Sequence, residues 1–471
     1  MKRGKKGRPD RCRTAECQGQ APGPGPSVRP PSDRAWNVPD RSVMLAGHRQ
    51  LLATVHRTLW ANETALLCNA NGRTGTGATT AIIEFAHRHA RDYDIAWLIP
   101  AADPELVPIE MAALAEAIGL AGTTDDTEVA IARLLGTLQH QDRYLLVFDN
   151  AENPRQLARF LPTGHGHVVI ISADPHWQAY ATRHTVEPFT RSESVALLCA
   201  RRPDLSVEAA ARIATVLEDL PLAVDPAAAL LADTDMSAER LLSLLSDRML
   251  DCRPRSGTDP DPVAAMWAVA FDCMAADDPA TLALLTLVAW LGPEPVPLHL
   301  ITEHPYELPK SLVDTARSPT VLAERITGLR RRGLARITSD SVALHRGPAA
   351  RLVARTAYEH LDGAGGWVAA AVRLLRAAVP QDPGGDPTSW ATWRQLLPLV
   401  LAATDPTRCL NEAAADAGWL LHHAASYLYV RGQARAAEAL SRDADDLCTA
   451  HRDRPYHEPI LEPAARIRAG A

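Results

Sequence analysis

The stretch of sequence that decides the fold is LLCNANGRTGTGATTAIIEFAHRHARDYDIAWLIP, residues 66–100. It starts as a short apolar strand, passes through a glycine-rich loop into a segment of helical periodicity, and ends in a second buried strand. Residues 72–79 spell G-R-T-G-T-G-A-T, which fits the phosphate-loop pattern G-x-x-x-x-G-K-[ST] except that Ala78 stands at the lysine position. The stretch therefore predicts a strand, a phosphate-binding loop and a helix, with one cation replaced.

The loop is expected to bind phosphates through its backbone. A glycine turn aims backbone N–H groups at phosphate oxygens, and the N-terminus of the following helix adds its dipole. The residues expected to form this cradle and the first turn of the helix are Gly72, Gly75, Gly77, Thr79 and Thr80. The hydroxyl of Thr79 is expected to hold Mg²⁺ together with Asp149, which ends the apolar strand YLLVFD.

Apolar strands alternate with helical segments over residues 39–188. The strands are TALLCN, DIAWLIP, RYLLVFDN and HVVIISA, and the segments between them have helical periodicity. Short apolar strands that alternate with helices imply a parallel sheet with helices on both faces. The fold class expected for residues 39–188 is therefore an α/β P-loop NTPase domain.

The rest of the chain reads as mainly helical. Residues 189–251 contain four helical segments, and CRPRSGTDPDP then marks a linker. Over residues 262–360, three helical segments, a hairpin in ARITSDSVALH and a helix from Pro348 predict a winged-helix domain. Residues 366–471 are expected to be helical and to contain one helix-turn-helix unit of about 34 residues, typical of a partial tetratricopeptide-like array.

Charge and composition limit the classes of function. The chain of 471 residues has a net charge of −7, and residues 1–13 contain seven Lys/Arg and one Asp. This local charge of +6 leaves −13 for the remainder, which argues against nucleic acid as a partner. Residues 1–38 are basic and proline-rich, and we expect them to be disordered. No apolar run reaches the ~20 residues of a membrane span, so we expect a cytoplasmic protein that does not enter the membrane.

Three pairs of histidines could suggest a metal site. Glu84 lies one helical turn before the first pair, but no second such pair of ligands follows, so we expect solvated surface residues instead. The pairs are His87/His89, His165/His167 and His422/His423.

Taken together, these motifs resemble the NB-ARC branch of the STAND class of signalling ATPases, and more closely the actinobacterial regulators that join this module to tetratricopeptide repeats. The matching segments are GRTGTGATTAIIEFAHRH, DYDIAWLIPAADPEL, LLVFDNAENPRQL, SVALL and DLPLAVDPAAALL, and the resemblance covers residues 36–450. It implies a helical ARC-type domain over residues 189–251 and ADP or ATP with Mg²⁺ as cofactors. It also implies that Pro221 packs on the adenine and that His345 touches the terminal phosphate of bound ADP.

Three positions depart from the pattern of this class. Ala78 replaces the lysine, Ala173 stands where an arginine that senses the terminal phosphate is usual, and His48 takes an arginine position in LAGHRQLL. The chain has no lysine between residues 7 and 309, so Arg73 in the loop is the one nearby cation expected to compensate. A charge-assisted hydrogen bond contributes about 1.5–3 kcal/mol, so losing the lysine weakens binding roughly 10- to 150-fold.

We therefore expect a regulatory protein of this class that binds ADP or ATP weakly and lacks efficient hydrolysis. A protein or peptide partner is expected on the helical C-terminal region, and oligomerisation fits the class. Two alternatives stay open. The chain could be an interaction scaffold that binds no nucleotide, or a winged-helix DNA-binding regulator that uses the basic helix end GLRRRGLAR, residues 328–336.

Overall fold

The computed structural model describes residues 34–41, 47–70, 75–122, 124–251, 261–359, 361 and 366–450. Residues from 35 onward form one compact unit, and everything described below belongs to it. Gly72 and Arg73 of the glycine loop lie outside the described residues, as do most of the predicted tail and linker.

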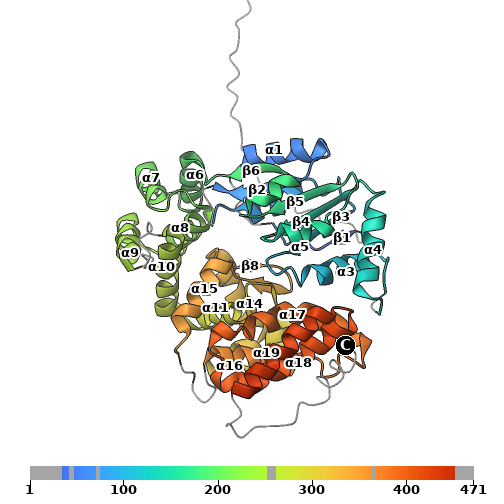
Figure 1. The fold of residues 1–471 in the computed structure, drawn as a ribbon. Helices are drawn as coiled ribbons and strands as arrows, with labels where there is room; N and C mark the ends of the chain where they lie inside the picture. Colours follow the sequence, from blue (N-terminus) through green and yellow to red (C-terminus); the bar gives the residue numbers. More distant parts are fainter. Residues whose placement is uncertain are drawn as a thin grey trace, which may run out of the picture. The chain divides into compact units, whose positions relative to one another are not determined.

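A parallel sheet of six strands forms the α/β region, residues 35–188, as the alternating pattern predicts (Figure 1). Its order is β1-β3-β4-β5-β2-β6, and every neighbouring pair is parallel. The strands are β1 (Ala35–Trp36), β2 (Ala65–Asn69), β3 (Ile95–Pro100), β4 (Tyr144–Asp149), β5 (His167–Ile171) and β6 (Thr182–Val186). The glycine loop follows β2, and only β5 separates β2 from the strand that ends in Asp149.

Helices cover both faces of this sheet. Along β4, Leu145 and Val147 pack on one face and Leu146 and Phe148 on the other, as the alternation of a strand requires. The first face is covered by α1 (Arg49–Trp60) and α2 (Ala78–Arg88), and the second by α3 (Val107–Ala117), α4 (Thr127–Leu138) and α5 (Pro154–Leu157). The predicted α/β layers are thus confirmed.

The four-helix region, residues 189–251, contains the four helices that the sequence predicts. Their N-termini are well defined: Thr190 and Glu193 form a capping box at α6, Ser206 caps α7, and a proline begins α8. The helices are α6 (Arg191–Arg201), α7 (Val207–Val216), α8 (Pro221–Asp233) and α9 (Ala238–Asp251).

The hairpin region, residues 261–359, contains more helices than the sequence indicates. Five described helices, not three, precede the predicted hairpin, because the expected single segments are divided at Pro279 and again near Pro305 and Pro309. The helix after the hairpin begins at Arg346, before Pro348. The elements are α10 (Pro262–Asp277), α11 (Pro279–Leu291), β7 (Val296–Pro297), α12 (Leu298–Glu303), α13 (Lys310–Arg317), α14 (Pro319–Arg331), β8 (Arg336–Ile337), β9 (Ser341–Ala343) and α15 (Arg346–Thr356).

The C-terminal region, residues 366–450, ends in the predicted helix-turn-helix unit. Gly432, with φ of 81°, makes the turn between the last two helices. The helices are α16 (Trp367–Ala378), α17 (Trp390–Ala403), α18 (Ala414–Val430) and α19 (Ala434–Ala450). The prediction that His422 lies on the solvated surface is wrong, because α18 packs it into the interior, where it is 2% exposed.

One hydrophobic core joins the three helical regions. It runs from Leu197 in α6 through Trp267 and Leu329 to Trp393 and Leu420 in the C-terminal region. The boundaries expected from the sequence therefore do not separate independent cores. Among the described residues, no helix has both the length and the apolar character that crossing a membrane requires.

Candidate nucleotide site

Two glycines in the described part of the loop adopt left-handed backbone angles. Gly75 and Gly77 have φ angles of +89° and +88°, which L-residues with a side chain rarely adopt. Gly77 is the N-cap of α2, and no side chain caps this helix end. The first backbone N–H groups of α2 are therefore available to an anion.

The N-termini of α8 and α10 lie against this loop. The backbone N–H of Leu222 donates to the carbonyl of Gly75 at 3.2 Å. A Cβ atom added at Gly75 would lie 3.1 Å from Val263 and 3.2 Å from Leu222. The buried indole of Trp267 donates to the Leu222 carbonyl at 2.9 Å and fixes this start of α8. Sequence analysis did not identify Leu222, Val263 or Trp267, because no local pattern indicates that a distant helix start will contact the loop.

Pro221, expected at the nucleotide, is brought to the loop by the same helix start. A Cβ atom added at Gly77 would lie 3.6 Å from the ring of Pro221. Pro221 and the loop are more than 140 positions apart in sequence, so their proximity agrees with the predicted shared site.

His48 also contacts the loop. Its Nε2 atom donates to the carbonyl of Thr76 at 2.8 Å, which requires the Nε2–H tautomer. The imidazole is buried and packs against Phe189, with ring centroids 5.3 Å apart. Burial lowers the pKa of His48, although the bond to Thr76 opposes this shift. His48, at a position where the resemblance implies an arginine, thus supports the loop as a neutral hydrogen-bond donor.

The predicted magnesium pair is assembled. Thr79 Oγ1 donates to Asp149 Oδ1 at 2.9 Å, and Asp149 is buried. Burial raises the pKa of Asp149, and the bond from Thr79 partly opposes the rise. A hydroxyl and a carboxylate suit Mg²⁺ when phosphate oxygens and waters complete its shell. Within the described ranges, no group of three or more His, Cys, Asp and Glu side chains gathers as a site of its own.

Ala78 and Ala173, where the resemblance implies cations, bring no charge to the loop. Ala78 is buried in the first turn of α2, where it packs in the core under the first face of the sheet. Thr80, the third residue of the helix, is partly exposed. Ala173 is exposed just beyond β5.

Positive charge reaches the site from the hairpin region instead. The charges of Arg336 on β8 and Arg346 on α15 both lower the pKa of Asp149. Arg346 Nη2 is 2.6 Å from Glu294 Oε1, and burial raises the pKa of Glu294. Arg73, the cation expected in the loop, lies outside the described residues and stays a prediction, whereas the effect of Arg336 and Arg346 was not expected. Arg336 ends the basic stretch at residues 328–336, so its charge was visible in the sequence but its location was not.

His345 lies in the same charged cluster. It is the N-cap residue of α15, and burial lowers its pKa to about 3, with a further lowering by the charge of Arg336. The imidazole is therefore neutral near pH 7. Its predicted contact with a terminal phosphate stays a prediction.

The structure resembles one solved protein over nearly its whole length. This is a STAND (signal transduction ATPase with numerous domains) protein with a tetratricopeptide repeat sensor from Pyrococcus horikoshii, with a TM-score of 0.51 and 11% sequence identity over 92% of this chain. The chain spans 65% of the length of that protein. At this level of identity the likeness shows the fold alone, an α/β region followed by helical regions.

Two other structures align less well. The Walker-type ATPase of Pyrococcus abyssi aligns with a TM-score of 0.29 and 12% identity, over 66% of this chain and 97% of that chain. Cdc6p of Pyrobaculum aerophilum aligns with a TM-score of 0.29 and 16% identity, over 69% of this chain and 97% of that chain. Scores at this level do not bear on the fold. No protein-family model matches the sequence, and no curated protein matches it.

Proposed function

We propose that this chain is a regulatory protein of the NB-ARC branch that binds ADP or ATP with Mg²⁺ and does not hydrolyse ATP efficiently. The proposal rests on the hydrogen bond between Thr79, just after the glycine loop, and Asp149 at the end of β4. Their assembly across 70 positions of sequence supports a retained nucleotide site.

The same site argues against hydrolysis. Phosphoryl transfer depends on positive groups that stabilise charge on the transferred phosphate. Ala78 and Ala173 provide none, and His48 is engaged with the loop backbone as a neutral donor. Binding through backbone N–H groups needs no such charge, so weak binding without turnover is the expected combination.

In this proposal, nucleotide controls how the regions close on one another. The α/β domain of residues 39–188, the ARC-type domain of residues 189–251 and a winged-helix domain of residues 262–360 would hold ADP between them. Pro221 would pack on the adenine and neutral His345 would donate to the terminal phosphate. Such a switch works only if the ligand binds one arrangement more tightly than the other. A protein or peptide partner on the tetratricopeptide-like residues 366–471 would receive the signal in the cytoplasm, and oligomerisation would extend it.

A pure interaction scaffold is the second candidate, and one observation favours it. The carbonyls of Gly75 and Thr76 are both held by donors of the protein itself, the Leu222 N–H and His48. A loop supported in this way keeps its shape without relying on a ligand. The helical surface would then be the functional part.

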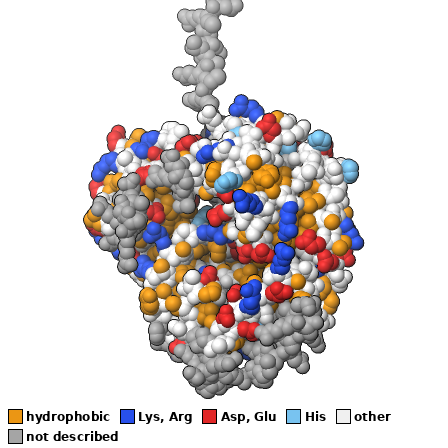
Figure 2. All heavy atoms as spheres, viewed as in Figure 1, with side chains coloured by type: hydrophobic (Ala, Val, Ile, Leu, Met, Phe, Trp, Pro, Cys, Tyr) orange, Lys and Arg blue, Asp and Glu red, His pale blue; other side chains and the backbone are white. Residues whose placement is uncertain are grey.

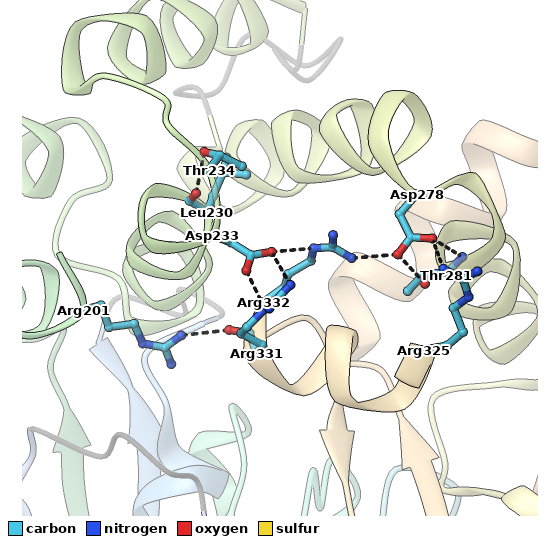
Figure 3. A network of polar contacts seen from close by, with 9 residues as sticks. All are labelled: Arg201, Leu230, Asp233, Thr234, Asp278, Thr281, Arg325, Arg331 and Arg332. Carbon is cyan, nitrogen blue, oxygen red and sulfur yellow. Dashed lines mark hydrogen bonds and ion pairs between the residues drawn. The ribbon is translucent and has the colours of Figure 1, made fainter. Parts of the chain in front are cut away.

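DNA binding is less well supported, because arginines of the basic stretch are paired with carboxylates of the chain itself. Arg331 and Arg332, in the basic stretch, both pair with Asp233 of α8, and Arg332 and Arg325 pair with Asp278 (Figure 3). On the face viewed in Figure 2, Lys and Arg side chains lie among Asp and Glu side chains and form no uniformly basic surface. The basic stretch thus serves contacts between helices of the chain.

The test is calorimetric titration of the full chain with Mg·ADP and Mg·ATP, together with phosphate release from ATP. We expect weak binding of both nucleotides and no release above background, and the Ala78→Lys variant should bind more tightly. Wild type that binds neither nucleotide, while Ala78→Lys does, would identify the scaffold. Rapid phosphate release by wild type would disprove the loss of hydrolysis.

A further inference from the structure

Arg336 is an unusual arginine within the hairpin region. It lies on β8 opposite Ala343 of β9, the strand that leads directly to His345. Its Nε atom is fully buried and has no hydrogen-bond partner among the described residues. A buried donor without an acceptor costs free energy, so its position needs an explanation.

Other arginines of the hairpin region pair with carboxylates. Six of them pair with a carboxylate at 2.5–3.3 Å, and these pairs hold helices together. They are Arg325, Arg331, Arg332, Arg346, Arg351 and Arg355. Arg336 makes no such pair within the described part of the chain, so its guanidinium remains available to an outside acceptor.

The surroundings of Arg336 identify the class of that acceptor. The chain just before β8 lies against α8, the helix whose start contacts the loop, because a Cβ atom added at Gly333 would lie 2.8 Å from Asp225. The charge of Arg336 also acts on Asp149, Glu294 and His345. Arg336 is bonded to neither Asp149 nor Glu294, whereas Arg346 bonds Glu294. An unpaired guanidinium whose charge acts on Asp149 suits an anion that also binds Mg²⁺, and a nucleotide phosphate is such an anion.

We propose that Arg336 binds the terminal phosphate of the nucleotide and supplies the positive charge that Ala78 lacks. This inference rests on the proposed nucleotide binding and adds the residue that compensates for the lost lysine. A guanidinium can donate two parallel hydrogen bonds to one phosphate, which a lysine cannot.

The location of this charge has a consequence for regulation. A lysine at position 78 would belong to the loop and would bind phosphate whatever the hairpin region does. Arg336 belongs to β8, so the phosphate would contact the loop and the hairpin region at once. Nucleotide affinity would then depend on contact between these two parts of the chain, and loss of the terminal phosphate would weaken that contact.

The experiment compares the affinities of the full chain for Mg·ADP and for AMP. The variants are Arg336→Gln, Arg336→Lys and a matched control, Arg355→Gln, whose arginine pairs at 2.7 Å with Asp272, well inside α10 rather than at its start. Arg336→Gln should weaken ADP binding roughly 10- to 150-fold, the range of a charge-assisted hydrogen bond. AMP binding should change little, Arg336→Lys should recover part of the ADP affinity, and Arg355→Gln should resemble wild type.

A double variant distinguishes lost contact from lost structure. Ala78→Lys added to Arg336→Gln should restore ADP binding, since it returns the charge from the loop side. Equal ADP affinity of wild type and Arg336→Gln would overturn this inference and leave the proposed function intact. An equal loss for ADP and AMP would also overturn it, because it would indicate a structural role. Wild type that binds no ADP would overturn both proposals.

Discussion

Arg431, in the turn after α18, lies with its Nη2 atom 3.2 Å from Oε1 of Glu116 at the end of α3. The two residues are 315 positions apart in sequence, and Arg431 is 5% exposed. Its other terminal nitrogen donates to the carbonyl of Asp125 at 3.0 Å, and Arg394 of α17 pairs with the same Glu116 at 2.5 Å. One carboxylate therefore joins the C-terminal region to the α/β region.

The first prediction concerns this junction. Glu116→Gln removes the charge that two arginines share, so we expect the free energy of unfolding to fall by about 1.5–3 kcal/mol. Urea unfolding monitored by circular dichroism measures it. Glu438→Gln, at an exposed position of α19, is the control and should change stability by less than ~0.5 kcal/mol. Equal stability of the two variants would show that the junction contributes nothing.

The second prediction concerns the glycine loop. Gly75→Ala puts a side chain at a φ of +89° and a Cβ atom 3.1 Å from Val263, so we expect a loss of about 1–2 kcal/mol in stability and weaker ADP binding. Gly136→Ala provides the contrast, since this position lies inside α4 with open space around it and should gain ~0.5–1 kcal/mol. Thermal unfolding and ADP titration of both variants test the pair. A Gly75→Ala variant as stable as wild type contradicts the strained geometry.

The third prediction concerns the magnesium pair. Asp149→Asn keeps the shape of the side chain and removes the charge, so the advantage of Mg²⁺ for ADP binding should disappear. For each protein, the affinity for ADP measured with Mg²⁺ is divided by the affinity measured with EDTA. This ratio should be above one for wild type and near one for the variant. The same ratio in both proteins would exclude Asp149 as the metal ligand.

The fourth prediction concerns pH. Burial lowers the pKa of His345 from 6.5 to about 3, so below pH 6.5 the unfolded chain takes up a proton that the folded chain does not. The contribution of neutral His345 to stability is complete above pH 6.5 and is lost as the pH falls toward 3, by at most about 1.4 kcal/mol per pH unit. His345→Gln should flatten this part of the curve, measured by urea unfolding from pH 7.5 to 4.5. Parallel curves for wild type and variant would contradict a buried neutral imidazole.

The sequence predicts the central strands and the glycine loop better than the edge strands and the contacts between regions. Strands β2 to β5 and the loop after β2 have local periodicity and glycine spacing that identify them, and Thr79 and Asp149 follow from that local pattern. The edge strands were missed because β1 has two residues and β6, TRHTV, is mostly polar and exposed. Arg336 could be seen as a charge but not as a neighbour of Asp149, because 187 residues separate them and no periodicity encodes packing between regions.

The single core shared by α6 to α19 has a consequence for synthesis on the ribosome. The two cores of the sheet use residues up to Val186, so they can close soon after that residue leaves the exit tunnel. The helical core extends to Ala437, about 250 residues later, which takes roughly 13–50 s at ordinary translation rates. During that interval the apolar faces of α6, α8 and α10 lack their later partners, so the nascent chain should depend on chaperones far more for its second half than for its first.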